Sequence, residues 1–404
     1  MSHPGTLVLI MFIAVLSPLL ADRAARRIRV PLVIFEIALG IVVGPQLLGW
    51  AHTDRVTDTL ANLGLSMLIF LAGYEIDFAA VRGPTLNRSL AAWPVSLALG
   101  IGIAFLLADG GLSEVFVVGT ALTSTALGTV LPILRDSGDL GSPFGKAASA
   151  FGAVGEFGPV VAVALLLSGR RPGEAAAVLI AFAVVTAAAV LWALRPRPPW
   201  FSRLVDETLH SSGQFAVRFV MLLLAAMLGL ATVFGLDVLL GAFAAGVLTR
   251  LVLQGAAPET GPEIMGKVEA VGFGFLVPLF YVVTGIEFDL DALLHDARAL
   301  LLVPVFLALF VIVRGGPVYA LAPRESGRRD RAALTLFCST CLPLVVAITT
   351  IGTDQRILPT DTAAALVGAA MISVLVLPLT AMRLRRGRGG GAAPSGTPAE
   401  SETW

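Results

Sequence analysis

The sequence predicts an all-α polytopic membrane protein of about 13 transmembrane helices, in two inverted repeats with two crossed discontinuous helices. Three observations predict it: an apolar composition, a series of membrane-length apolar runs, and motifs of the first half that return in the second. Of the 404 residues, 56% are hydrophobic and 14% charged, whereas soluble domains have about 45–50% and about 25%. The formal net charge is zero, so we expect no nucleic-acid partner, and two cysteines exclude a disulfide framework.

Thirteen apolar runs lie between charged or turn-rich breaks, and a helix needs ~20 mainly apolar residues to cross the bilayer. The expected spans are residues 5–21, 30–49, 57–78, 89–108, 112–134, 145–168, 174–194, 214–234, 236–253, 266–286, 299–321, 332–352 and 361–382. The first is not expected to be a cleaved signal peptide, because its basic cluster, Arg23 to Arg29, follows the apolar core instead of preceding it.

Positive charge predicts the orientation, because loops rich in Lys and Arg stay in the cytoplasm. Most of the 28 Lys and Arg residues fall in the loops of one side. This places the N-terminus outside and the C-terminus inside a cytoplasmic (inner) membrane. Residues 386–404 are rich in Gly, Pro and Ser, which is typical of a disordered tail, and no soluble domain is expected beyond the spans.

Two motifs recur in the same order at nearly equal distances. Residues 73–77 (GYEID) end the third span and residues 285–289 (GIEFD) end the tenth, 212 residues later. Residues 122–127 (LTSTAL) of the fifth span match residues 337–342 (FCSTCL) of the twelfth, 215 residues later. By the expected orientation the third span ends inside and the tenth ends outside.

An inverted repeat explains this pattern, and inverted repeats are the architecture of secondary transporters. We expect residues 1–168 to form the first repeat, 169–213 a connector helix and loop, and 214–385 the second repeat. The alternative is a chance similarity between apolar segments.

The Thr-Ser-Thr and Cys-Ser-Thr clusters lie in the middle of spans, close to glycine and proline residues. A helix that breaks there exposes backbone groups that can line a polar cavity in the membrane. We therefore expect Thr123, Ser124, Ser339 and Thr340 to face an ion path. The alternative is an ordinary helix whose hydroxyls bond back to the preceding turn.

Four ionisable residues lie well inside the spans: Glu36, Glu156, Arg218 and Arg314. Each charged group costs ~2.5–3.5 kcal/mol to insert on translocon scales, so each is a functional candidate. Glu156 is the foremost, in a stretch of glycines before Pro159. Burial favours its neutral form and a nearby cation its charged form, so it can hold a proton or a metal cation in competition. The alternative is a structural acid paired with an arginine.

Arg314 is the expected counter-charge of Glu156, and because arginine stays protonated it would orient or neutralise rather than carry protons. Glu36 fits a structural or a functional role equally. Arg218 lies one turn into its span and can extend to the interface. Glu75 and Asp77, at the inner end of the third span, are secondary candidates that could gather cations.

No enzyme motif is present, and the four histidines lie in or near loops, so we expect neither an enzyme nor a cofactor. Cys338-x-x-Cys341 lies inside an apolar span, which argues against a redox motif. An intramembrane hydrolase would want a second acid or a metal-ligand set, and a receptor without transport is a further alternative.

The sequence resembles bacterial monovalent cation:proton antiporters of the second cation:proton antiporter family, which includes the Kef-type potassium efflux systems. The resemblance rests on residues 30–45 (VPLVIFEIALGIVVGP), 68–77 (LIFLAGYEID) and 240–246 (LGAFAAG), and it extends over roughly residues 5–385. It implies a 13-helix sodium/proton antiporter fold, usually homodimeric, with a mobile core around two unwound helices, here the fifth and twelfth spans.

By this resemblance the ion-carrying acid maps onto Glu156, its basic partner onto Arg314, and Thr123 and Ser124 lie near the ion. Many relatives have an Asp preceded by Asp, Asn or Gln, where this chain has Gly155-Glu156. A single acid predicts electroneutral exchange of one Na⁺ or K⁺ for one H⁺. The Kef nucleotide-binding tail is missing, so gating by nucleotides is not expected. The alternative function is sodium-coupled symport of a small organic solute.

Overall fold

The computed structural model describes residues 3–25, 31–75, 83–107, 111–166, 172–193, 214–256, 259–295 and 297–386. These ranges contain helices and connections but no strand. The α-helices are α1 (His3–Ala25), α2 (Leu32–Val43), α3 (Arg55–Glu75), α4 (Pro84–Leu107), α5 (Leu112–Ala121), α6 (Leu127–Asp136), α7 (Pro143–Leu166), α8 (Pro172–Ala193), α10 (Phe215–Val233), α11 (Val238–Ala256), α12 (Gly261–Val271), α13 (Val277–Glu287), α14 (Leu290–His295), α15 (Ala297–Leu309), α16 (Gly316–Leu321), α17 (Arg328–Cys338), α18 (Pro343–Asp354) and α19 (Thr360–Arg386).

The predicted all-α membrane architecture is confirmed. Eleven helical segments of the described chain are long and apolar enough to cross a membrane, and the shorter helices α2 and α5 lie within the second and fifth predicted spans. The tenth and eleventh spans each contain a π-helical turn, Gly272–Leu276 and Phe310–Gly315. Such turns occur often at functional sites, and the apolar pattern did not reveal them.

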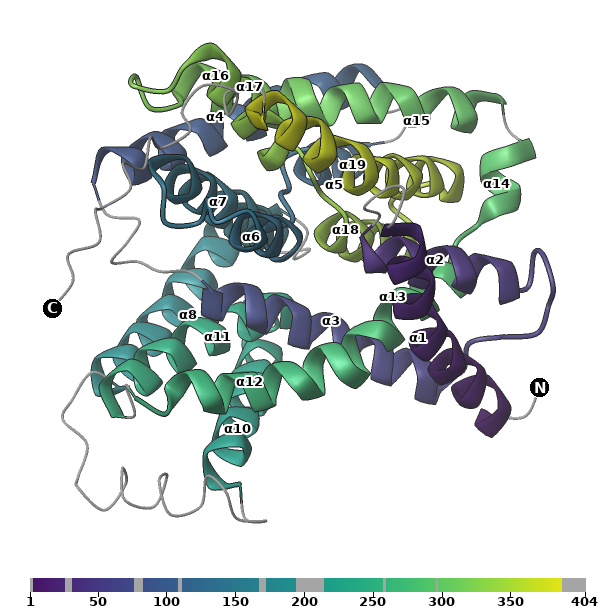
Figure 1. Cartoon of the computed structure of the whole chain (residues 1–404), viewed down its shortest axis with the longest axis horizontal. Helices are drawn as coiled ribbons and strands as arrows, with labels where there is room; N and C mark the ends of the chain where they lie inside the picture. The colour runs from purple at the N-terminus through teal and green to yellow at the C-terminus, as the bar shows by residue number, and fades with distance from the viewer. Residues whose placement is uncertain are drawn as a thin grey trace, which may run out of the picture.

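The helices gather in two groups that face each other (Figure 1). Helices α1, α2, α3, α10, α11, α12 and α13 form one group, and α8 lies beside α11 at its edge. Helices α4 to α7 and α15 to α19 form the other. The second group contains both clusters that were predicted to break a helix, whereas the first group consists of continuous helices and one π-helical turn.

The first group is held by close approach of backbones at glycine. A Cβ at Gly40 of α2 would lie 3.0 Å from the Cα of Gly285 in α13, and a Cβ at Gly246 of α11 would lie 2.7 Å from the backbone nitrogen of Tyr74 in α3. Small residues allow this close approach. Because lipid tails are as apolar as the side chains, hydrophobicity does not drive membrane helices together, and close packing of this kind holds them instead. Any larger side chain at these positions would separate the helices.

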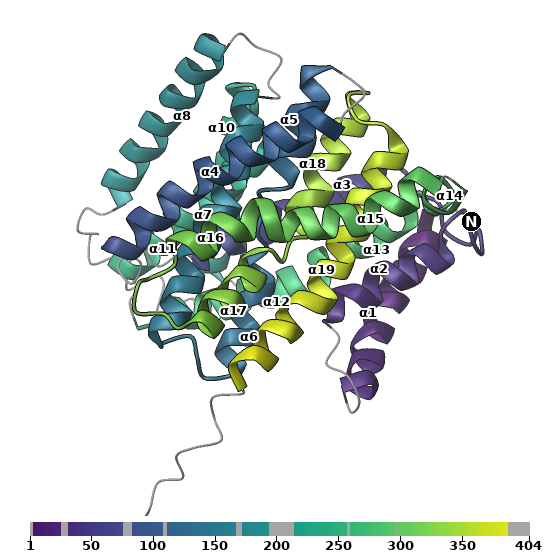
Figure 2. The same cartoon turned by 90° about the horizontal axis from the view of Figure 1, so that it is seen from above.

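The second group contains two broken helices, as predicted. Helix α5 ends at Ala121 and α6 begins at Leu127, while α17 ends at Cys338 and α18 begins at Pro343. The two breaks touch, because the backbone N–H of Ala126 donates to the carbonyl of Thr340 over 2.7 Å. Helices α5 and α18, one from each broken helix, lie beside each other in both views (Figures 1 and 2).

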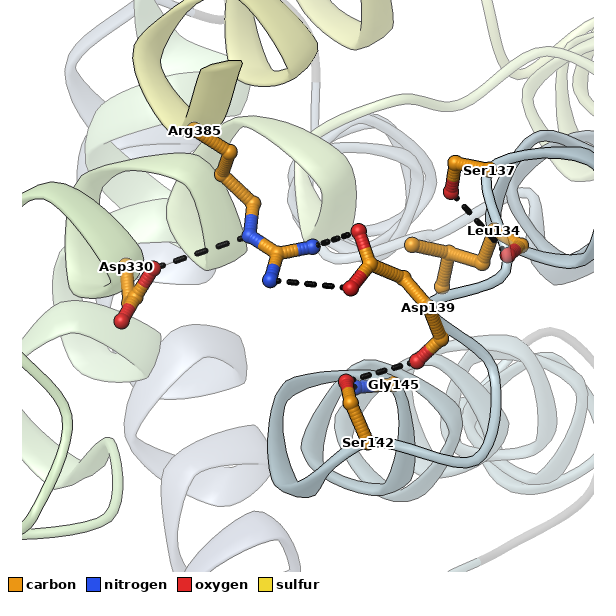
Figure 3. Close-up of polar contacts among 7 residues, drawn as sticks. All are labelled: Leu134, Ser137, Asp139, Ser142, Gly145, Asp330 and Arg385. Atoms are coloured by element: carbon orange, nitrogen blue, oxygen red, sulfur yellow. Dashed lines mark hydrogen bonds and ion pairs between the residues drawn. The ribbon is translucent and has the colours of Figure 1, made fainter. Parts of the chain in front are cut away.

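One end of this group is fastened by a charged cluster around Arg385 of α19 (Figure 3). Its guanidinium pairs with Asp139 in the connection between α6 and α7, and its Nε lies 3.6 Å from Asp330 of α17. The same guanidinium lies 3.8 Å from the ring centroid of Phe144. One arginine thus ties both broken helices to α19.

Two predicted regions lie outside the described residues. These are Asp77, and the expected tail 386–404 except for Arg386, the last residue of α19. The division of the chain into repeats at residues 1–168 and 214–385 stays a prediction.

Candidate ion-binding site

Glu156 lies in the middle of α7 and is 3% exposed. One oxygen of its carboxylate lies close to the backbone N–H of Leu127, the first residue of α6. The first N–H groups of a helix have no partner inside the helix and form its positive end, so the break provides a favourable place for an anion. The other carboxylate oxygen, Oε2, is buried without a hydrogen-bond partner among the described residues.

Thr125, inside the first break, joins three segments. Its hydroxyl donates to the carbonyl of Cys338 over 2.6 Å, and its backbone N–H donates to the carbonyl of Gly155 over 3.0 Å. The same hydroxyl accepts from Nε of Arg314 at 3.0 Å. Thr125 therefore links both breaks to α7 and to the π-helical turn that carries Arg314.

Arg314 is completely buried and contacts the helix breaks rather than Glu156. Besides Thr125, its Nη2 donates to the carbonyl of Phe151, and no ion pair joins it to Glu156 within the described chain. Its guanidinium lies against the bare face of Gly155, where a Cβ would be 2.8 Å from Cζ. Adjacent residues of a helix point about 100° apart, so a side chain that packs on Gly155 faces away from Glu156. Arg314 thus contacts the residue next to Glu156, and its role as the counter-charge of Glu156 stays a prediction.

Nη1 of Arg314 is also buried without a partner among the described residues. An unsatisfied buried cationic group and an unsatisfied buried carboxylate oxygen at one crossing are unusual, because such groups are normally hydrogen-bonded or bind water or an ion. Their coexistence makes the crossing a candidate site for a polar ligand.

The four hydroxyl residues predicted from sequence all lie at the breaks and are at most 1% exposed. Each donates to a carbonyl three or four residues earlier: Thr123 at 2.8 Å, Ser124 at 2.7 Å, Ser339 at 2.8 Å and Thr340 at 3.1 Å. The helices are therefore broken, as expected, and the hydroxyls also bond back to the preceding turn, as the alternative proposed. The two interpretations do not exclude each other. With their protons directed to carbonyls, the hydroxyl oxygens keep lone pairs for a cation.

Ser373 of α19 was not expected. Its hydroxyl accepts from the backbone N–H of Cys341 at 3.1 Å and lies 2.9 Å from the Cys341 carbonyl. It therefore supports the backbone of the second break. A lone serine in the last apolar span was the only sequence signal for this role. Thr125 was more conspicuous in the sequence, because it belongs to the Thr-Ser-Thr cluster, but the sequence did not indicate that it links three segments.

The secondary candidates lie on the first group of helices. Glu75 ends α3, interacts electrostatically with Glu156, and has a buried Oε2 without a partner in the described ranges. Arg135 and Arg250 interact with Glu75 in turn. Glu36 in α2 is 3% exposed, and Tyr281 of α13 lies near both Glu36 and Glu156.

These groups supply an oxygen-rich site with one central acid. Within the described ranges, no cluster of three or more His, Cys, Asp or Glu side chains is placed to hold a metal ion. Neutral hydroxyl and carbonyl oxygens beside one carboxylate suit a weakly held cation better than a permanently bound divalent or transition metal.

Comparison with known proteins agrees with this geometry. The profile of the transmembrane sodium/hydrogen exchanger family matches residues 10–384. The chain belongs to this family. The fold is also that of a solved structure, the sodium proton antiporter MjNhaP1 from Methanocaldococcus jannaschii, with a TM-score of 0.66 over 96% of this chain and 98% of that one, at 14% identity.

Three relatives show the range of similarity. Cation/H(+) antiporter 18 of Arabidopsis thaliana is 30% identical over 92% of this chain and 48% of its own length. The Na(+)/H(+) antiporter of Enterococcus hirae is 22% identical over 92% of this chain and 96% of its own. YjbQ of Bacillus subtilis (strain 168) is 27% identical over 95% of this chain and 64% of its own. This chain thus spans only about half to two thirds of the length of several relatives. The resemblance to cation:proton antiporters stated from the sequence is confirmed.

Proposed function

We propose that this protein is a secondary antiporter that exchanges a monovalent cation, Na⁺ or K⁺, for H⁺ by alternating access. The single observation that carries the proposal is the buried, unpartnered Oε2 of Glu156 at the crossing of two helix breaks. An acid in this position is neutral when protonated and needs a counter-ion when ionised. Proton and cation therefore compete for it, and this competition couples their fluxes.

The surrounding oxygens complete the proposed cation site. Thr123, Ser124, Ser339 and Thr340 offer hydroxyl oxygens and adjacent carbonyls, while Arg314 fixes the breaks through Thr125. Because Arg314 is always charged, it contributes a fixed positive charge near Glu156 and does not carry a proton. No cofactor is required by this scheme.

Alternating access follows if the group with the broken helices moves against the other group. The two groups meet next to Glu156, where the rings of Phe157 in α7 and Phe243 in α11 stack with centroids 4.8 Å apart. A small displacement at this contact would expose Glu156 to one side of the membrane or to the other. The inverted repeats at residues 1–168 and 214–385 would supply the two matching conformations.

Exchange is proposed to be electroneutral, because Glu156 is the one acid at the crossing in the described chain. Glu75 interacts with it but has Arg135 and Arg250 as its own counter-charges, so Glu75, with Asp77, is assigned to attracting cations. Glu36, beside Tyr281, is a second candidate for proton or cation transfer. Exchange measured at clamped membrane potentials tests the stoichiometry, since a rate that changes markedly with voltage contradicts it.

The decisive experiment compares three proteins in proteoliposomes that carry a pH gradient. Na⁺, K⁺, Li⁺ or Rb⁺ is added to wild type, Glu156→Gln and Glu114→Gln. Glu114 of α5 is a matched control, because it is another buried acid, 6% exposed, whose side chain makes no hydrogen bond to the crossing within the described chain. We expect a cation to collapse the gradient in wild type and Glu114→Gln but not in Glu156→Gln.

Retained exchange in a folded Glu156→Gln protein would refute the role of Glu156. If no cation collapses the gradient in folded wild type, antiport itself is refuted, and a sodium-coupled solute symporter becomes the next function to test. The proposed setting is a homodimer in the cytoplasmic membrane, with the N-terminus outside and the C-terminus inside, as the distribution of Lys and Arg indicates.

A further inference from the structure

An open groove of 490 Å³ runs along the outer surface of the second helix group. The π-helical turn and α16 form one wall, with Ile312, Gly316 and Tyr319, and α17 forms the other, with Ala332 and Leu336. Its lining is almost entirely apolar. Ile312 is 55% exposed and Tyr319 41% exposed, so the groove opens where the membrane lies. Helices α16 and α17 are neighbours in both views (Figures 1 and 2).

Basic side chains stand at one end of this groove. Arg324, in the connection between α16 and α17, and Arg328, the first residue of α17, are both exposed. Arg328 precedes the lining residue Ala332 by four positions, so both lie on the same face of α17. The connection is folded over α17, because Arg331 donates to the carbonyls of Ser326 at 3.1 Å and Arg324 at 3.4 Å.

Helix stability does not explain this charge, because cations in the first turn of a helix oppose its dipole. Nor is the charge cancelled by the adjacent Asp330, which is engaged by Arg385 at 3.6 Å (Figure 3). The connection between α16 and α17 also contains one acid, the exposed Glu325. Residues 324–331 contain four arginines and two acids, so this end of the apolar, membrane-facing groove has a net positive charge.

We infer that this groove binds one anionic phospholipid, with an acyl chain between α16 and α17 and the phosphate at Arg324 and Arg328. Basic pockets at the cytoplasmic ends of membrane helices bind anionic headgroups, and the proposed orientation places this connection at the inner leaflet. Tyr319 lies near the charged end of the groove, as expected for an aromatic side chain at the membrane interface.

A lipid bound in the groove would contact the segment that positions Arg314. A Cβ at Gly315, the residue after Arg314, would lie 2.7 Å from Oγ of Ser339, and the Thr335 hydroxyl lies 3.4 Å from the Gly315 carbonyl. Thr335 also lines the groove. Only one layer of side chains therefore separates the acyl chain from the second helix break.

The test measures binding of phosphatidylglycerol and of phosphatidylcholine to the purified full chain by native mass spectrometry. One variant, Arg324→Gln/Arg328→Gln, removes the headgroup contacts. A second variant, Gly316→Leu, fills the groove, because a Cβ at Gly316 meets no atom within 4 Å. Each has a matched control. Lys146→Gln/Arg383→Gln removes two other exposed basic residues, and Gly102→Leu adds a side chain at another exposed, unobstructed helix glycine.

We expect wild type and both controls to bind phosphatidylglycerol more tightly than phosphatidylcholine. The double arginine variant should lose about fivefold in affinity for phosphatidylglycerol per arginine, and Gly316→Leu should weaken binding of both lipids. Equal losses in test and control variants would show diffuse attraction to the chain and overturn the site, as would the absence of a preference in wild type. Since the measurement involves no ion transport, its failure is distinct from failure of the proposed antiport.

Discussion

The two helix breaks meet at one crossing, but the side chains packed on them differ in charge. At the first break, Thr125 accepts from Arg314, and Glu156 lies against the start of α6. At the second, Ser373 contacts the backbone of Cys341 with neutral hydrogen bonds. Two breaks of similar sequence thus have different surroundings. In the proposed ion site, the charge comes from the helices packed on the breaks and not from the breaks themselves.

This asymmetry has a simple energetic reason. Each charged group in the membrane costs ~2.5–3.5 kcal/mol, so under the proposed electroneutral exchange a second acid at the crossing would add a cost without adding a carrier that is needed. At the offset of 215 residues that relates the two breaks, Glu156 corresponds to Met371. The second half of the chain therefore has an apolar residue where the first half has its buried acid.

The largest effect is expected from Gly155→Ala, which places a methyl group where the Arg314 guanidinium and the Thr125 hydroxyl now lie. Overpacking of this kind costs about 1–3 kcal/mol, and here it displaces the arginine that holds both breaks. We expect exchange in proteoliposomes to fall to background and the thermal unfolding temperature in detergent to drop.

Gly128→Ala is the control, because Gly128 belongs to the first turn of α6 and a Cβ there meets nothing within 4 Å. It should exchange like wild type. If Gly155→Ala exchanged as fast as Gly128→Ala, close packing of Arg314 on Gly155 would have no part in transport, and the contrast between a charged and a neutral break would lose its main support.

A smaller effect is expected from Thr125→Val, which keeps the shape of the side chain but removes its hydroxyl. The Cys338 carbonyl then loses a donor and Nε of Arg314 loses its acceptor. A hydrogen bond to a charged group contributes about 1.5–3 kcal/mol, and thermal unfolding should report a loss of this size. Thr125→Ser restores the hydroxyl and should recover most of the stability. Equal stability of the valine and serine variants would contradict the linking role of Thr125.

The sequence was sufficient to predict the membrane architecture and the positions of both breaks, and it singled out Glu156 as a candidate, which the structure places in a buried position. Apolar runs reveal spans, and hydroxyl clusters within them reveal where a helix can unwind. Glu156 was identifiable because a buried acid is costly and therefore rare. These features depend on residues close together in the chain, which is why they can be recognised without a structure.

The contacts between distant segments could not be predicted. The sequence made Arg314 the natural counter-charge of Glu156 but could not show whether the two side chains touch, and the guanidinium lies against the bare face of Gly155, one residue away. The linking position of Thr125 depends on which carbonyl of the second break faces it. The π-helical turn at Phe310–Gly315, which orients Arg314, adds no distinctive residue pattern.

The smallest effect is expected from Ser373→Ala, at the neutral break. The Cys341 N–H would lose its side-chain acceptor, and a neutral hydrogen bond contributes only about 0.5–1.5 kcal/mol. Because no charged group depends on Ser373, we expect a modest decrease in thermal stability and exchange close to the wild-type rate. If Ser373→Ala instead abolished exchange while the protein remained folded, the second break would share directly in ion binding. The division between a charged, ion-binding break and a neutral, supporting break would then have to be abandoned in favour of a site formed equally by both.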